Sequence, residues 1–100
     1  MTKEQSISWI FVSLAIASEN GPAGVAGISA IADGINHAIP TEEEMYSSLN
    51  WLTMQGFVEE QHNRYLLTNK GKKEYAQAAS ASVKLFHTWN NAAAQLKQYM

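Results

Sequence analysis

The sequence contains no cysteine, which removes disulfide bonds, thiolate zinc sites and thiol nucleophiles from consideration. Proline and glycine are also scarce, with two and six residues among 100, and only 16% of the residues are charged against 46% that are hydrophobic. This composition excludes collagen-like and disordered chains and is typical of one globular domain. A reducing cytoplasm is the compartment we expect.

No apolar run approaches the roughly 20 residues that span a bilayer. The uncharged stretch 5–18 is interrupted by Ser6, Ser8 and Ser13. The chain also lacks the basic start and cleavage site of a signal peptide. We therefore expect no membrane segment.

Recognisable catalytic and metal-binding motifs are missing. The histidines His37, His62 and His87 are spaced without a second ligand at metal-binding distance, and no serine lies in a G-x-S-x-G pattern. The glycines between 21 and 27 do not form a phosphate-binding loop. The expectation is a protein without enzymatic activity, metal or cofactor.

Three helices are expected in the first half of the chain. Thr2 with Gln5 forms a capping-box pattern that begins a helix over 3–19, which is apolar on two faces and therefore buried on two sides. Apolar residues recur at helical spacing from Val25 until Pro40 interrupts them. Thr41 with Glu44 forms a second capping box and predicts a helix over 42–55.

The second half predicts a hairpin and a long helix. The segments 57–61 and 64–68 have β-type composition and flank His62 and Asn63, which suit a tight turn. Thr68 is the expected N-cap of a helix that continues to Met100, about 45 Å at 1.5 Å per residue. The expected fold class is mainly α with a small β-hairpin.

A heptad seam in this last helix indicates a homodimer. Apolar side chains are spaced alternately four and three residues apart, and residues so far along the helix should reach a partner chain. The two-faced first helix could assist. The candidate dimer interface comprises Trp9, Tyr75, Ala79, Phe86, Trp89, Ala93, Leu96 and Met100.

The order helix, helix, helix, hairpin, helix resembles a winged helix-turn-helix domain. The segment from Tyr65 to Gly71, Tyr-Leu-Leu-Thr-Asn-Lys-Gly, is similar to the return strand of winged-helix regulators of the MarR and PadR type. The resemblance implies a winged-helix domain over 1–74 and a long C-terminal dimerisation helix over 75–100, both in one compact unit. It also implies a transcription-regulator-like protein that binds duplex DNA.

In such regulators the third helix enters the major groove and the hairpin touches the DNA backbone or minor groove. Carried over to this chain, the candidate DNA-binding residues are Thr41, Tyr46, Ser47, Asn50, His62, Asn63 and Arg64, with Glu42 and Glu43 on the same helix.

The distribution of charge supports an alternative function. Residues 1–60 hold one lysine against eight carboxylates, whereas residues 61–100 hold six basic residues against one glutamate. The expected DNA-reading helix contains no lysine or arginine, although phosphate neutralisation supplies most non-specific affinity for DNA. A winged-helix module that binds protein and not DNA is therefore the second hypothesis.

Overall fold

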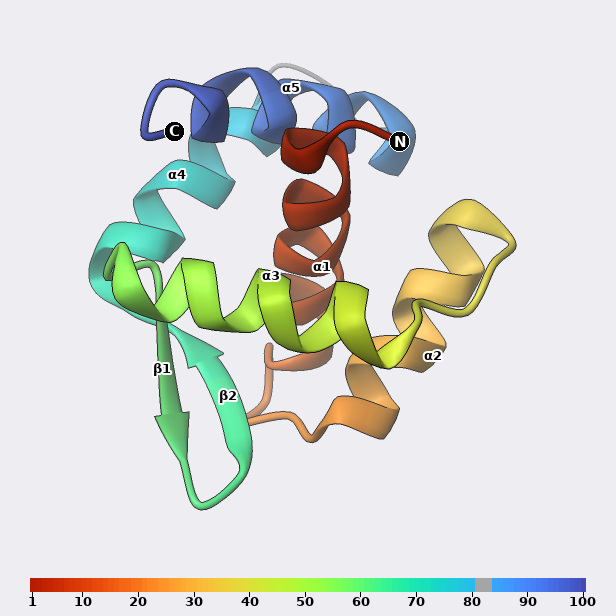
Figure 1. The fold of residues 1–100 in the computed structure, drawn as a ribbon. Coiled ribbons are helices and arrows are strands. Elements are labelled where there is room, and N and C mark those ends of the chain that lie inside the picture. The colour runs from red at the N-terminus through yellow and green to blue at the C-terminus, as the bar shows by residue number, and fades with distance from the viewer. Residues whose placement is uncertain (81–83) are drawn as a thin grey trace.

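Helix α1 (Lys3–Ala17) runs through the middle of the fold, and the other helices surround it (Figure 1). The computed structural model describes residues 1–80 and 84–100, which form a mainly helical fold with a small hairpin. Every residue from Ile7 to Ala15 is buried, because α2 (Val25–Asn36), α3 (Glu42–Met54) and α5 (Leu85–Lys97) all pack against α1. Burial on two sides is thus confirmed, and it is achieved within one chain.

The two capping boxes form as the sequence indicates. The Thr2 and Thr41 hydroxyls accept the backbone N–H groups of Gln5 and Glu44, and the latter side chains accept the threonine N–H groups in return. Each box satisfies two donors that the first turn of a helix leaves without partners. Helix α1 ends two residues earlier than predicted, at Ala17, and α2 ends at Asn36, where His37 follows as a C-cap in the left-handed conformation.

Strands β1 (Val58–Gln61) and β2 (Arg64–Leu67) form the antiparallel hairpin, in which Gln61 pairs with Arg64. A third extended segment, which the sequence did not reveal, joins it. The backbone N–H and C=O of Ala23 exchange hydrogen bonds of 2.8 Å with those of Tyr65. The connection between α1 and α2 is therefore hydrogen-bonded to the edge of β2 that does not pair with β1.

The prediction of one continuous helix from 69 to 100 is wrong. Helix α4 (Asn69–Ser80) ends, Lys84 has an extended backbone, and α5 begins at Leu85. The chain reverses so that α5 lies across the N-terminal half of α1 and beside α4 (Figure 1). The physical reason is that α1 has a second apolar face, which the reversal covers without a partner chain.

This reversal decides where the candidate dimer residues lie. Trp89, Ala93 and Leu96 are buried inside the chain, and Trp89 donates its indole N–H to the carbonyl oxygen of Gln5 over 2.8 Å. Trp9 is 1% exposed and donates to the carbonyl oxygen of Ala32 over 2.9 Å. These four residues are therefore not available to a partner in this arrangement.

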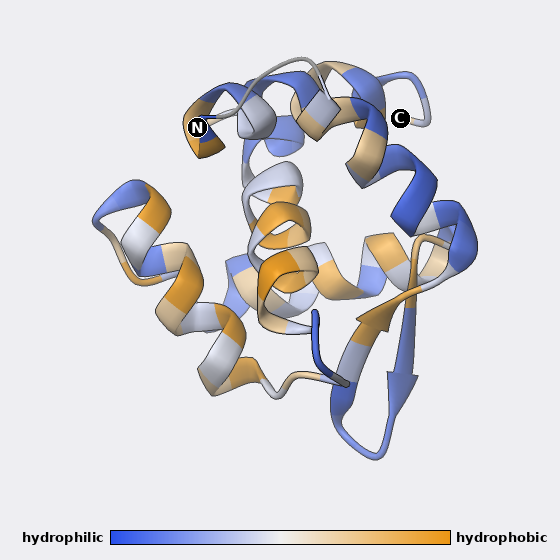
Figure 2. Ribbon diagram, turned by 180° about the vertical axis from the view of Figure 1, so that it is seen from behind, coloured by the Kyte–Doolittle hydropathy of each residue, from blue (hydrophilic) through white to orange (hydrophobic). Residues whose placement is uncertain are grey.

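The rest of the seam is partly or fully accessible. Tyr75 and Ala79 are half-buried, and Phe86 and Met100 are exposed. Seen from behind, hydrophobic residues concentrate in α1 and α2, whereas the hairpin turn and most of α4 are hydrophilic (Figure 2). No helix in the described ranges is both long enough and apolar enough to cross a membrane.

Candidate interaction surface on α3 and the hairpin

Helix α3 buries one side against α1 and presents the other to solvent. Met45, Ser48, Leu49 and Leu52 are buried, and this spacing turns the intervening positions outward. The predicted site residues Thr41, Tyr46, Ser47, Asn50, His62, Asn63 and Arg64 are all exposed. We call the surface formed by these seven residues the α3–hairpin face.

The hairpin extends this face on one side of α3. A cavity of about 300 Å³ lies between the two elements, lined by Tyr46, Asn50 and Thr53 of α3 and by Glu60 and Tyr65 of the hairpin. Burial, the Glu60 carboxylate and Tyr46 together raise the pKa of Tyr65 above its ordinary value. Tyr46 and Asn50 are thus brought next to the hairpin.

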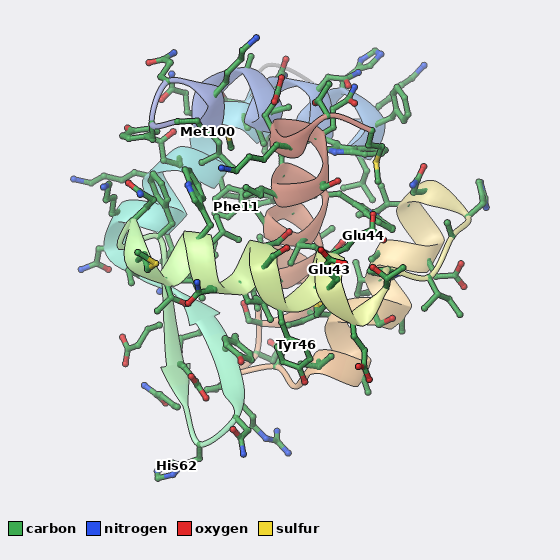
Figure 3. All side chains as sticks on the ribbon, in the orientation of Figure 1. Phe11, Glu43, Glu44, Tyr46, His62 and Met100 are labelled. Carbon is green, nitrogen blue, oxygen red and sulfur yellow. The ribbon has the colours of Figure 1, made fainter. Side chains whose placement is uncertain are left out.

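The three predicted residues of the turn lie farther out. His62 and Asn63 have φ angles of 52° and 64°, the pair of left-handed residues that a two-residue type I′ turn requires. Figure 3 shows His62 at the far end of the hairpin and Tyr46 on the side of α3 that faces the hairpin. The turn and α3 therefore form two separate contact regions of one surface.

The charge of this surface is strongly acidic. Glu42 and Glu43 are exposed on α3, and Glu59 and Glu60 are exposed on β1. Arg64 is the one arginine or lysine on α3 or the hairpin. Within the part of the chain that the structure describes, none of these four carboxylates forms an ion pair. The exposed side chains of α3 and the hairpin therefore carry a net negative charge, which disfavours polyanions and favours cations.

Two features next to the surface have structural roles. Trp51 is half-buried and stacks on Phe57, with ring centroids 6.2 Å apart. Lys70 donates to the carbonyl oxygen of Gln55 over 2.8 Å and lies 4.5 Å from the centroid of the Phe57 ring. Lys70 thus joins the end of α3 to the start of α4, whereas Lys72 and Lys73 are exposed on α4.

Sequence reasoning missed Glu60 and Thr53 as neighbours of the predicted site. A signal for Glu60 was present, because residues two apart in a strand share a face and Glu60 is two residues from the buried Val58. Thr53 lines the cavity, and its hydroxyl donates to the carbonyl oxygen of Leu49 over 2.7 Å.

No three His, Asp or Glu side chains among the described residues are grouped so that they could hold a metal ion. The buried side-chain polar atoms of the same residues all have hydrogen-bond partners. Polar groups available for recognition in the described residues are therefore those of exposed side chains, which include those of α3 and the hairpin.

Comparison with known proteins gives no relative. No protein-family model matches the sequence, and searches of curated proteins and of solved structures return no match.

Proposed function

We propose that this chain is a winged-helix module that binds another protein through the α3–hairpin face. The winged-helix interpretation is supported by the element order and by the extended segment at Ala23, which pairs with β2 between α1 and α2. In that architecture the third helix and the hairpin are the recognition elements.

The acidic charge of the recognition elements is the observation that carries the protein-binding function. A DNA-binding surface neutralises phosphates with lysine and arginine, which releases counterions and supplies most of the affinity. Here the recognition elements expose Glu42 and Glu43 on α3 and Glu59 and Glu60 on β1, against Arg64 alone. A protein partner with basic residues gains from the same charges that a phosphate backbone would oppose.

DNA binding remains a second candidate, favoured by the side chains at the centre of the face. Asn50 and Ser47 are exposed on α3, and an asparagine can bond adenine through two hydrogen bonds. Arg64 at the turn could contact one phosphate.

Fluorescence anisotropy with mixed-sequence duplex DNA at low salt separates the two functions. We expect no binding by the natural chain, and a gain of binding when Glu42, Glu43, Glu59 and Glu60 are all changed to Gln. Salt-dependent binding by the natural chain that is lost in Arg64→Ala would instead establish the DNA function.

Photo-crosslinking tests the protein partner directly. Benzoylphenylalanine placed at position 46 should give adducts in producing cells that survive nuclease and disappear with protease. The same group at position 73, which is exposed on α4 outside the α3–hairpin face, should not give these adducts. Nuclease-sensitive adducts at position 46 would contradict the proposal.

We also propose that the chain forms a homodimer through the start of α5. Leu85 and Phe86 are 45% and 58% exposed, and the Phe86 ring is held edge-on against the buried Trp89 at 5.5 Å between centroids. Light scattering at micromolar concentration should give a dimer, and Phe86→Ser should give a monomer. A monomer for the natural chain would end this part of the proposal.

A further inference from the structure

The side of α3 opposite the hairpin carries a second cavity, whose lining extends beyond the α3–hairpin face. Its volume is about 440 Å³, and it lies between the first turns of α1 and the whole length of α3. Its lining residues on α3 run from Glu43 to Met54. Figure 3 shows Glu43 and Glu44 on this side of α3 and Tyr46 on the other. We call this cavity the α1–α3 groove.

One wall of the groove is formed by α3, so its length can be compared with that of a short helix. Helix α3 has 13 residues, which correspond to about 20 Å at 1.5 Å per residue. An amphipathic helix of three to four turns that lies along a hydrophobic groove is a recurrent mode of protein recognition.

One end of the groove is apolar and accessible. Met54 is 75% exposed, Trp51 beside it is fixed by stacking on Phe57, and Ile7 forms part of the opposite wall. Methionine is flexible and polarisable, so it adapts to an incoming apolar side chain, and tryptophan is a frequent anchor of interfaces. This end fits leucine or phenylalanine side chains.

The other end of the groove is acidic. Glu43 and Glu44 line it, and Lys3 is the single cation among the lining residues. The Glu44 carboxylate is held in place because it accepts the backbone N–H of Thr41 over 2.9 Å. On α1, the nearby Glu4 is already paired with Lys97 at 3.8 Å. This end therefore attracts lysine or arginine side chains, and it disfavours an acidic peptide.

We infer that the α1–α3 groove is the docking site for an amphipathic helix of the partner protein, with basic residues at one end and apolar residues at the other. This inference rests on the proposed protein-binding function and names the chemical class of its partner. The groove and the α3–hairpin face share Thr41, Ser47 and Asn50, so one partner can contact both.

The probe for a test is a synthetic 16-residue helical peptide with three lysines in its first half and leucines at helical spacing in its second half. Its matched control has glutamate at the three lysine positions. We expect the lysine peptide to shift the backbone amide resonances of residues 3–7 and of α3 in the isotope-labelled full chain, and to leave those of α2 in place. The glutamate peptide should leave all of them unchanged.

Paired variants then test the two ends of the groove. Glu43→Lys should weaken binding of the lysine peptide about tenfold, because it replaces an attractive charge by a repulsive one. Asp33→Lys makes the same charge change on exposed α2 and should alter the affinity less than about twofold. Met54→Ala should weaken binding of the lysine peptide about fivefold. Ile39→Ala, which shortens another exposed apolar side chain, should leave the affinity unchanged. Circular dichroism confirms that each variant is folded.

Equal losses in Glu43→Lys and Asp33→Lys, equal binding of both peptides, or no shifts at about 1 mM peptide would each overturn the groove as the docking site. If the groove fails these tests but protein adducts still form at position 46, the chain binds a protein at a surface other than the groove. Nuclease-sensitive adducts would instead refute the proposed function itself.

Discussion

Gly71 lies so close to Phe57 that a β-carbon on the glycine would overlap the phenylalanine carbonyl oxygen. Thr68 holds the two segments at this separation. Its N–H donates to the same Phe57 oxygen over 3.0 Å, its hydroxyl donates to the Gly56 oxygen over 2.6 Å, and it accepts the Gly71 N–H over 3.1 Å. The Leu-Thr-x-x-Gly pattern is therefore a joint between the hairpin and α4.

Replacing Gly71 by alanine should weaken the fold. Because the obstructing atom belongs to the backbone and not to a flexible side chain, we expect Gly71→Ala to lower the free energy of unfolding by about 2–3 kcal/mol. Urea denaturation measures the change. Gly34→Ala is the matched control: its β-carbon would meet nothing within 4 Å in α2, and alanine should stabilise the helix there by about 0.5–1 kcal/mol. Equal changes in the free energy of unfolding for Gly71→Ala and Gly34→Ala would contradict the close contact between Gly71 and Phe57.

Local patterns were sufficient to predict most of the secondary structure. A capping box is a contact between residues three apart, so Thr2 and Thr41 set the starts of α1 and α3 regardless of the rest of the chain. The left-handed turn at Asn63 is likewise local, and the exposed positions of α3 followed from helical spacing.

The path of the last third could not be obtained in this way. A heptad seam indicates that Trp89 and Leu96 pack on another apolar surface, but it does not distinguish a partner chain from α1 of the same chain. The decisive contact, from the Trp89 indole to the Gln5 carbonyl, joins residues 84 positions apart. The groove was also hidden, because it forms where α1 and α3 meet in space.

Chemical crosslinking tests the reversal of α5. Glu4 and Lys97 form an ion pair of 3.8 Å between helices α1 and α5, and the natural chain has no cysteine. We expect Glu4→Cys with Lys97→Cys to react with a short bismaleimide to give an internally linked monomer on a denaturing gel. A covalent dimer would show that α5 packs on α1 of a second copy. Either single variant serves as the control.

Tyr99 should make stability depend on alkaline pH. Its hydroxyl donates to the Glu74 carboxylate over 2.8 Å, and this hydrogen bond, desolvation and the glutamate charge raise the pKa of Tyr99. The unfolded chain loses that proton first, near pH 10, so the stabilisation is complete below pH 10 and declines as pH rises through the folded-state pKa. Thermal unfolding between pH 8 and 11 should show a shallower decline for Tyr99→Phe than for the natural chain.

The turn residues His62 and Asn63 separate the stability of the hairpin from its recognition role. Both have positive φ, and histidine in this conformation is strained by about 1 kcal/mol relative to a residue that tolerates it. Asn-Gly is the preferred pair for this turn, so His62→Asn with Asn63→Gly should raise the free energy of unfolding by about 1 kcal/mol. Asn36→Gly, in the last turn of α2, should lower it by about 0.5 kcal/mol.

The same double variant removes two side chains from the α3–hairpin face. If His62 and Asn63 contact the partner, the more stable protein should give fewer protein adducts from benzoylphenylalanine at position 46, because the outer contact region of the face is lost. If the double variant is more stable and its adduct yield is unchanged, the partner contacts α3 and not the turn residues. A loss of stability would contradict the turn geometry, since glycine at φ 64° relieves strain that asparagine retains.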